Sequence, residues 1–323
     1  MKLVTNNLHI DNIIATWLAA NTYTGTKTGK YISATTLLKS PQQQILQLKA
    51  QNNEEVVQVT DISTLLKSRI GTAIHADIQQ CWENPQLRIT ALQALGVPNE
   101  LIAKIDVNPS IPQEDHVNLY FEQRVEKEFM GWTISGQFDL VVDNSLHDFK
   151  STSTYTYEHK TKEQDYIEQG SIYRWLSPEL IKDDFLTIHY IFTDWSKNYV
   201  HKEGYPPHPF VSIKLPLLSL NETESMIRQR LNTIDFNMDK EELPPCDPKT
   251  LMQEEVWQYF SSPTSLRSGK NFDNPVDANK YLSEKGYGII KKKPTEPKGC
   301  SYCNCRGICK QYAGFVKQGL IKE

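Results

Sequence analysis

The sequence contains no hydrophobic run long enough to cross a membrane, and it has no excess of basic residues. Its 35 Lys and Arg stand against 39 Asp and Glu, which gives a net charge of −4. This balance argues against a general positive coat for loose nucleic-acid binding, but it does not exclude a local basic groove or an acidic pocket for divalent cations. The first twenty residues lack the basic start, apolar centre and cleavage site of a secretion signal. We expect a cytoplasmic protein with no membrane partner.

Cysteine is scarce and unevenly distributed. Cys81 and Cys246 stand alone, whereas Cys300, Cys303, Cys305 and Cys309 lie within ten residues. Disulfides are rare in a reducing compartment, so this cluster indicates a metal site. Thiolates select zinc or an iron–sulfur cluster. Cys300, Cys303 and Cys309 make a compact three-ligand set whose fourth member is Cys246 or Cys305; Cys81 is a weaker candidate, because its helical position looks like core.

Repeats and low-complexity segments are also absent, and a hydrophobic fraction of 39% can fill a sizeable core. Apolar spacing and capping signals predict helices over residues 42–51, 61–82, 163–176, 219–234 and 254–260. Alternating or apolar runs predict strands within 117–142 and over 146–150, 185–195 and 210–215, with a hairpin turn at Asp143–Asn144. This order predicts an α/β fold with a mixed central sheet flanked by helices.

Three regions follow from these patterns. Residues 1–30 are polar and are expected to form an irregular arm, residues 31–238 the α/β core, and residues 239–323 a cysteine-containing tail stapled by metal. In the helix expected over 61–82, Leu65, Leu66, Ile70, Ile74 and Ile78 form a stripe that we expect to be buried. His75 lies on or next to this stripe.

The pattern that carries chemistry is Gly136–Asp139 followed by Asp148–Lys150. Side chains alternate along a strand, so Asp148 and Lys150 project from one face, and a hairpin brings Asp139 beside them. Two carboxylates can hold Mg²⁺ or Mn²⁺, which polarises a phosphate and lowers the pKa of a bound water. The lysine can orient that water or stabilise charge on the phosphate. The alternative is a surface hairpin with a simple Asp148–Lys150 salt bridge.

Four motifs occur in order along the chain: Gly71–His75, Gly136–Asp139, Asp148–Lys150 and Gln169–Tyr173. In this order they resemble the RecB-like branch of the P-D-(D/E)-x-K nuclease superfamily, which has a restriction-endonuclease-like core. Further segments resemble phage-encoded members of that superfamily: Tyr31–Leu38, Ile191–Ser196, Tyr205–Pro206 and Leu243–Cys246. The chain departs from the family at Gly170 and Ser171, where members often have leucine and asparagine.

The resemblance implies roles for individual residues. His75, Asp139 and Asp148 would be metal ligands together with the backbone carbonyl of Phe149, and Lys150 would be the catalytic lysine. Gln169 and Tyr173 lie four residues apart on one helix face, where they would contact the DNA backbone or steady the site. Ordinary helix packing is the alternative for both. Glu122 precedes the site on a strand and is only a supporting candidate.

The tail is similar to AddB-type nucleases, in which C-x2-C-x5-C and one distant cysteine hold a [4Fe–4S] cluster. That similarity makes Cys246, Cys300, Cys303 and Cys309 the ligands, with Zn²⁺ as the alternative metal and a structural role. The run Lys291–Lys293 before the cluster is either a phosphate contact or a solvated loop.

Two functions fit these features. The first is a metal-dependent DNA nuclease, an exonuclease or an endonuclease, that acts on single- or double-stranded ends in recombination, repair or DNA degradation within a phage-infected bacterial cell. The second is an inactive DNA-binding accessory subunit of a helicase–nuclease complex, since fold does not fix function. A helicase or a recombination protein would be the partner. The intact Asp139, Asp148 and Lys150 set favours the enzyme.

Overall fold

The computed structural model of the protein describes residues 2–20, 29–52, 58–247, 251–252, 255–293 and 295–321. The chain forms two compact units. One, the sheet unit, comprises residues 4–39 and 61–239, and the other, the cysteine unit, comprises residues 1–3, 40–60 and 240–323. No helix among the described residues has both the length and the apolar character that crossing a membrane would demand.

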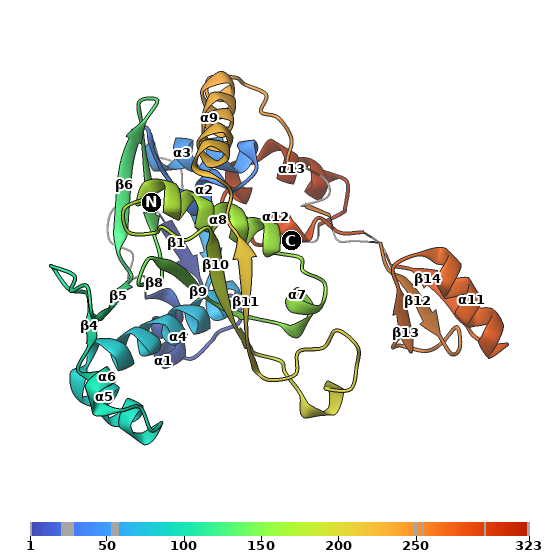
Figure 1. Ribbon diagram of the computed structural model, residues 1–323. Helices are drawn as coiled ribbons and strands as arrows, with labels where there is room; N and C mark the ends of the chain where they lie inside the picture. Colours follow the sequence, from blue (N-terminus) through green and yellow to red (C-terminus); the bar gives the residue numbers. More distant parts are fainter. Residues whose placement is uncertain are drawn as a thin grey trace. The chain divides into compact units, whose positions relative to one another are not determined.

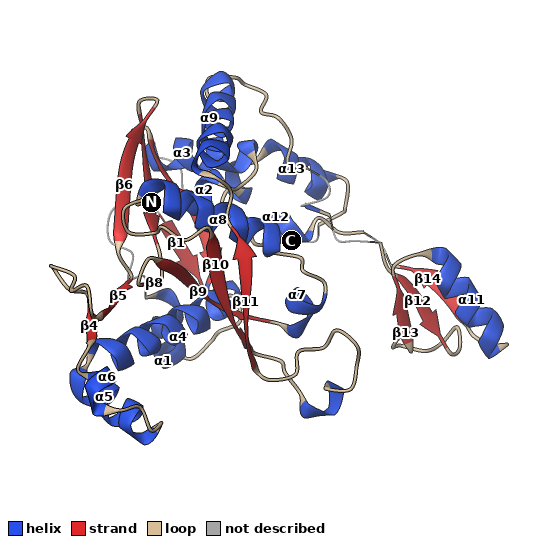
Figure 2. Ribbon diagram, viewed as in Figure 1, coloured by secondary structure: helices blue, strands red, loops and turns tan. Residues whose placement is uncertain are grey.

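A mixed six-stranded sheet is the centre of the sheet unit, in the order β11-β10-β9-β8-β5-β4 (Figures 1 and 2). Its strands are β4 (Ile105–Val107), β5 (Val117–Phe121), β8 (Leu140–Val142), β9 (Ser145–Thr152), β10 (Phe185–Phe192) and β11 (Phe210–Pro216). β9 runs parallel to β10 and antiparallel to β8. The predicted mixed central sheet is thereby confirmed.

The β8–β9 hairpin closes as the sequence predicts. Asp143 and Asn144 have φ angles of 45° and 81°, the left-handed conformation that a tight two-residue hairpin requires. Val142 pairs with Ser145, and Leu140 pairs with His147. This register sets Asp139, which directly precedes β8, opposite Asp148 on β9.

A second hairpin leaves the six-stranded sheet between β5 and β8. Its strands, β6 (Arg124–Phe129) and β7 (Trp132–Gln137), join β2 (Tyr31–Ser33) in a separate three-stranded sheet. The chain therefore changes sheet twice, at Glu122–Gln123 and at Phe138–Asp139. The Glu122 N–H donates to the Asp139 carbonyl over 3.0 Å, so the two changes of direction lie side by side.

Two helices cover opposite faces of the six-stranded sheet (Figure 2). On one face, Ile78 and Trp82 of α4 (Leu66–Glu83) pack against a cluster of Leu119, Phe121 and Leu140. On the other, α8 (Glu163–Leu176) lies so close that a Cβ on Gly170 would meet Leu186 and Leu217 at 3.0 Å. Gly170 and Ser171, the two positions that depart from the family pattern, therefore lie at a close contact between helix and sheet. There the Ser171 hydroxyl accepts a hydrogen bond from the Leu218 N–H.

The other elements of the sheet unit are mostly short. They are α1 (Asn12–Ala19), α2 (Ala34–Leu37), η1 (Ile62–Leu65), α5 (Pro85–Ala94), α6 (Asn99–Ile102), α7 (Thr154–Glu158), η2 (Lys197–Tyr199) and α9 (Leu220–Asn237). β1 (Lys2–Thr5) and β3 (Gln58–Asp61) pair as a two-stranded sheet. The predicted helix from Ser219 is confirmed, with a complete capping box between Ser219 and Glu222.

The cysteine unit contains α3 (Pro41–Asn52), a three-stranded antiparallel sheet and several short helices. These elements are β12 (Trp257–Phe260), β13 (Lys270–Phe272), α11 (Pro275–Lys285), β14 (Ile289–Lys292), α12 (Lys298–Ser301), η3 (Arg306–Ile308) and α13 (Lys310–Lys317). The strands are ordered β13-β12-β14.

Two expectations about secondary structure are wrong. The helix expected over 254–260 is the strand β12, because Trp257, Tyr259 and Phe260 favour a pleated surface and pair with both neighbouring strands; Glu254 lies outside the described residues. The irregular arm expected over 1–30 contains α1, which Asp11 caps by accepting from the Ile13 N–H and in which Leu18 is buried. Residues 21–28 of that arm lie outside the described residues.

The stripe on α4 is also less buried than expected. Ile70, Ile74 and Ile78 are half-buried and Leu66 is exposed, because α4 contacts the sheet mainly through β9 and the cluster below Ile78 and Trp82. Cys81 is exposed, so it is not the core residue that its helical position suggested.

Asp61 ties the N-terminal segment to the start of the α4 region. One carboxylate oxygen accepts from the Thr5 hydroxyl at 3.0 Å and the Asn7 N–H at 2.9 Å, and the other from the Ser63 N–H at 3.0 Å. The Ser63 hydroxyl also donates to it and is the main reason that the pKa of Asp61 lies at about 2, below its ordinary 3.8. The charged form is therefore the one that the fold stabilises.

We expect Asp61→Ala to lower the free energy of unfolding by about 1–2 kcal/mol at pH 7, the typical value of a capping carboxylate. The depressed pKa means that this contribution is complete above pH 4 and is lost as the pH falls towards 2. Urea denaturation of both proteins across this range measures it. Asp77→Ala, at an exposed site on α4, is the control and should change stability by less than about 0.5 kcal/mol. Equal effects of the two substitutions would contradict the anchoring role of Asp61.

Candidate metal centre and cysteine site

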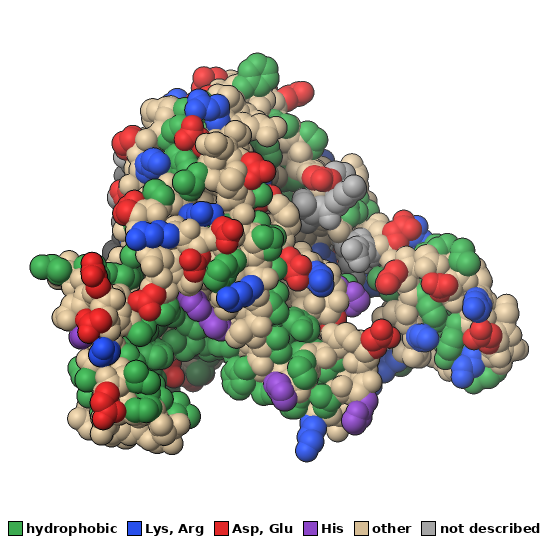
Figure 3. Space-filling view, in the orientation of Figure 1, with side chains coloured by type: hydrophobic (Ala, Val, Ile, Leu, Met, Phe, Trp, Pro, Cys, Tyr) green, Lys and Arg blue, Asp and Glu red, His purple; other side chains and the backbone are tan. Residues whose placement is uncertain are grey.

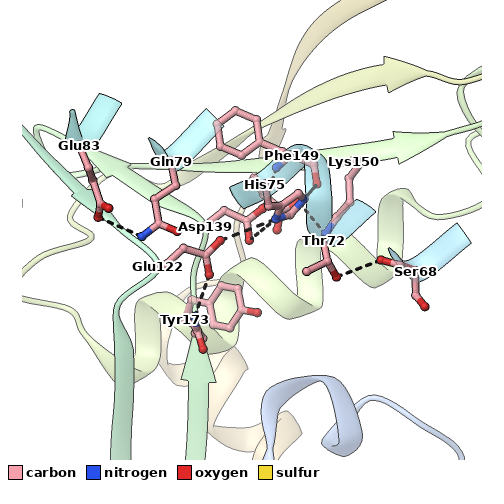
Figure 4. Close-up of polar contacts among 12 residues, drawn as sticks. Ser68, Thr72, His75, Gln79, Glu83, Glu122, Asp139, Phe149, Lys150 and Tyr173 are labelled. Carbon is pink, nitrogen blue, oxygen red and sulfur yellow. Dashed lines mark hydrogen bonds and ion pairs between the residues drawn. The ribbon is translucent and has the colours of Figure 1, made fainter. Parts of the chain in front are cut away.

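The candidate metal centre lies where the second hairpin leaves the six-stranded sheet. Three donor atoms, one each from His75, Glu122 and Asp139, lie within 4.8 Å of one another. His75 Nδ1 is 3.5 Å from Asp139 Oδ1 and 3.8 Å from Glu122 Oε1. Donors bound to one ion at about 2.1 Å are separated by roughly 3 to 4.2 Å, so this spacing fits a single divalent cation. Figure 4 shows His75 directed towards both carboxylates.

His75 is oriented for this role by the backbone of β9. Its Nε2 lies 2.9 Å from the Phe149 carbonyl oxygen, which can only accept, so Nε2 carries the proton and donates. Nδ1, the nitrogen that faces the carboxylates, then presents its lone pair in the neutral ring. A metal-binding histidine commonly donates its other N–H to a backbone carbonyl in this way. In the structure the predicted ligand Phe149 is therefore the partner that orients His75.

The electrostatics of His75 show how strongly this point attracts positive charge. Burial disfavours the protonated imidazole, but the carboxylates of Asp139 and Glu122 outweigh burial and raise the pKa of His75 to about 10. In the protein without a metal ion, the extra proton takes the place of a cation between the two acids. A divalent ion bound by His75 Nδ1 would have to displace this proton.

Asp139 is held by the neighbouring strand. Its Oδ2 accepts from the Phe149 N–H at 2.8 Å, which leaves Oδ1 pointing towards His75. Phe149 thus contacts the site through both of its backbone polar groups. The hairpin register that sets Asp139 opposite β9 makes this double contact possible.

Glu122 is the residue that the sequence analysis placed only in a supporting role. It has a φ of 49°, a backbone conformation that is uncommon outside glycine and that clusters at functional sites. Its Oε2 accepts from the Gln137 amide at 2.8 Å, and Gln137 in turn accepts from Arg124 at 3.0 Å. Oε1 remains directed at His75. The signal that could have found Glu122 is its position at the end of a strand, directly before the hairpin.

Asp148 and Lys150 project from the α8 face of β9, as their alternation predicts. Lys150 Nζ is 2.6 Å from Asp148 Oδ2, and Asp148 is 5% exposed, so the pair is no surface salt bridge. Burial raises the pKa of Asp148, an effect that Lys150 partly opposes. Burial also disfavours the ammonium form of Lys150, but Asp148 and Asp139 outweigh it and raise the pKa of the lysine. Asp148 is thus a buried carboxylate whose charge is balanced by Lys150.

Gln169 and Tyr173 form a hydrogen-bonded pair on α8. The Gln169 amide donates to the Tyr173 hydroxyl at 2.7 Å, and Tyr173 is 5% exposed. The Tyr173 ring packs on Gly136 so closely that a Cβ there would lie 2.7 Å from it. The glycine of the Gly136–Asp139 motif is therefore needed for the helix to approach β7. In the structure this pair lies where α8 packs against β7.

A separate set of thiols lies within the cysteine unit. Cys246, Cys300, Cys303 and Cys309 line one small pocket together with Gln42 and Gln43 from the start of α3. The Gln42 and Gln43 amides donate to the Cys309 and Cys303 sulfurs over 3.5 and 3.7 Å. Cys305 does not line this pocket; its sulfur lies 3.9 Å from the Gln43 carbonyl.

The chemistry of the thiol set suits a metal centre. Burial and the neighbouring sulfurs raise the pKa of Cys300 to about 11 and also raise that of Cys246. Thiolates at this point are therefore unfavourable unless a bound cation compensates them. Amide N–H groups directed at the sulfurs are contacts that tune thiolate ligands.

Comparisons with known proteins give only distant likenesses. No family model matches the chain, and no curated protein matches it. Among solved structures, SSO0001 matches at 13% identity and a TM-score of 0.37, over 65% of this chain and 78% of that one. A protein from Eubacterium rectale, provisionally named an exonuclease, matches at 10% identity and a TM-score of 0.37, over 68% and 85%. A phage-related exonuclease from Haemophilus somnus 129PT matches at 15% identity and a TM-score of 0.28, over 65% and 93%. Likenesses this distant do not assign the chain to a family or an activity.

We expect Glu122→Gln to weaken Mn²⁺ binding by about tenfold or more, because the amide removes one of three charged or basic donors. Isothermal titration calorimetry of wild-type and variant measures the affinity. The matched control is Glu100→Gln, which makes the same change at an exposed helix position. If Mn²⁺ bound equally well to all three proteins, Glu122 would not be a ligand.

Proposed function

We propose that this chain is a divalent-metal-dependent DNA nuclease, and that it works as an exonuclease at DNA ends in recombination, repair or DNA degradation. The observation that carries the proposal is the convergence of His75, Glu122 and Asp139 beside the buried Asp148–Lys150 pair. An acidic metal centre next to a lysine is the arrangement that phosphodiester cleavage needs.

A bound Mg²⁺ or Mn²⁺ would polarise the scissile phosphate as a Lewis acid. His75, Glu122 and Asp139 would hold this ion, and the imidazole favours Mn²⁺ over Mg²⁺. Asp148 would be the further carboxylate, buried on β9 with its Oδ2 2.6 Å from Lys150 Nζ. Phe149 orients two of these ligands, because its N–H donates to Asp139 and its carbonyl accepts from His75.

Lys150 would place a second positive charge, beside that of the metal ion, next to the scissile phosphate. Asp148 at 2.6 Å keeps the lysine an ammonium, and the ring of Tyr166 lies 5.1 Å from Nζ on its other side. The ammonium can then stabilise charge that develops on the phosphate oxygens, or orient the attacking water. Held between a carboxylate and a ring, it needs little reorganisation when the substrate binds.

For the thiol set we infer a [4Fe–4S] cluster held by Cys246, Cys300, Cys303 and Cys309, with Zn²⁺ as the alternative. The shared pocket and the amide donors from α3 support these four sulfurs and leave Cys305 outside. The role would be structural. Cys246 lies 54 positions before Cys300 in the sequence, so metal binding would close a long loop and stabilise the unit.

The test of the nuclease proposal is cleavage of linear and covalently closed circular DNA with Mn²⁺ or Mg²⁺. We expect loss of the linear DNA only, and Lys150→Ala should slow it by about 100-fold or more, as when one charge-stabilising donor is removed. Lys182→Ala, an exposed lysine in a loop, is the control and should cut normally.

Each other outcome has a definite meaning. Cleavage of the circle as well would make the protein an endonuclease. Normal cleavage by Lys150→Ala would refute the site. DNA binding without cleavage under either metal would favour the accessory subunit of a helicase–nuclease complex.

The cysteine proposal is tested by metal analysis of purified proteins. We expect iron in the wild-type protein, and loss of most of it together with lowered thermal stability in Cys246→Ser. Cys305→Ser should keep its metal, because its sulfur lies outside the pocket. Zinc in place of iron would correct the identity of the metal. Metal lost from Cys305→Ser but kept in Cys246→Ser would correct the ligand set.

A further inference from the structure

Between Cys246 and Cys300 the chain contains a small folded segment, residues 255–293, here called the insert. Its antiparallel sheet of β12, β13 and β14 packs against α11, and Tyr259 and Ala278 are 4% and 0% exposed. Asn274 caps α11, and Gly286 ends it with a φ of 71°. An insert with its own core and helix caps is a built module and not a connecting loop.

The sheet of the insert has one covered and one uncovered face. Tyr259 contacts Tyr281 of α11 at a ring distance of 5.1 Å, so the face of β12 that carries Trp257 and Tyr259 is covered. Gln258 and Phe260 alternate to the other face, where Gln258 pairs with Asn271 and Lys291 of the neighbouring strands. Among the described elements of the insert, no helix packs on this second face. This second face carries Gln258, Asn271 and Lys291 together with Phe260 and Ile289.

The insert is basic in an acidic protein. Residues 255–293 contain seven Lys and Arg against four Asp and Glu, a net charge of +3, whereas the whole chain carries −4. The rest of the chain therefore carries −7. On the face shown in Figure 3, blue and red side chains are interspersed without a broad basic band. A polyanion would meet net repulsion from the rest of the chain and net attraction from the insert.

The lysines of the insert are held mainly by aromatic rings. Lys270 and Lys285 lie 4.8 and 5.5 Å from the centre of the Tyr281 ring, and Lys291 lies 5.0 Å from that of Phe260. Among the ion pairs of the described residues, the insert contributes only Lys292 with Glu255. Lys291 also donates to the Pro263 carbonyl over 3.3 Å. A cation on a ring keeps most of its N–H donors free, so these ammonium groups stay available to phosphate oxygens.

We propose that the insert is a second DNA-binding module, which contacts the phosphate backbone without reading sequence. Lys270, which pairs with Tyr259, and Lys285 of α11 lie on its covered side, and Lys291 lies on its uncovered face. Lysine contacts to phosphates supply affinity of this kind, and rings beside them add stacking that tolerates any base. The proposal goes beyond the nuclease function, because it concerns binding and needs no cleavage. The thiol set joins the two ends of the insert, so a metal bound there would anchor the module at its base.

The test uses the full-length triple variant Lys270→Gln, Lys285→Gln and Lys291→Gln, which keeps the aliphatic stems but removes three charges. Binding to a single-stranded oligonucleotide and to a duplex is measured by fluorescence anisotropy with EDTA, so that nothing is cut. We expect binding to be weaker by at least about tenfold. We also expect the slope of log affinity against log salt concentration to become less negative by about 2. The form of DNA that loses more is the one the insert holds.

The matched control removes three exposed lysines elsewhere: Lys182→Gln, Lys214→Gln and Lys317→Gln. Lys214 lies 4.0 Å from the Phe185 ring, so the control also includes a lysine stacked on an aromatic ring. The control should bind within about twofold of wild type, and both variants should melt like wild type. Unchanged binding and salt dependence in the insert variant would overturn the proposal, as would an equal loss in the control.

This outcome is independent of the nuclease proposal. If the wild-type protein cuts no DNA but the insert variant loses binding, the nuclease function fails and the binding surface stands. If the protein cuts DNA but the insert variant binds it normally, the reverse holds.

Discussion

The hydrogen bond from His75 Nε2 to the Phe149 carbonyl is the interaction on which the site depends. It links α4, on one face of the sheet, to β9. Asp148 and Lys150 of β9 project from the opposite face. It also determines which imidazole nitrogen faces the carboxylates. The same residue, Phe149, holds Asp139 through its N–H, so one peptide segment of β9 orients two of the three donors. Donors fixed by a strand backbone need little rearrangement to bind a cation.

Close packing around this strand depends on glycine at three positions. A Cβ on Gly71 of α4 would lie 3.1 Å from the Ser151 hydroxyl oxygen. The absence of a Cβ at Gly136 leaves room for the Tyr173 ring, and its absence at Gly170 lets α8 pack closely on the sheet. At Gly136 a side chain would collide with the Tyr173 ring, and at Gly170 the neighbouring leucines would have to shift. The motif glycines are thus part of the scaffold, and the polar residues beside them form the site.

Much of the architecture follows from local patterns. The helix at 163–176, the hairpin turn at Asp143–Asn144 and the capping box at Ser219 all occur where apolar spacing and turn chemistry predict them. The expectations that were wrong share one cause, because contacts with distant parts of the chain decided the structure at those positions. The aromatic run at Trp257–Phe260 became a strand because two partner strands were available, and the α4 stripe stayed half-buried because α4 contacts the sheet mainly through β9 and the cluster below Ile78 and Trp82.

The sequence by itself determined that Asp148 and Lys150 share a face and that Asp139 lies opposite them, because strand alternation and a two-residue turn are local properties. It also placed five cysteines in the C-terminal region. Only the tertiary structure brought Glu122 to His75, since this depends on a chain that changes sheet twice at neighbouring points. Only the fold of the cysteine unit placed Cys246 with Cys300, Cys303 and Cys309 and set Cys305 apart, because contacts across so many residues leave no local signal in the sequence.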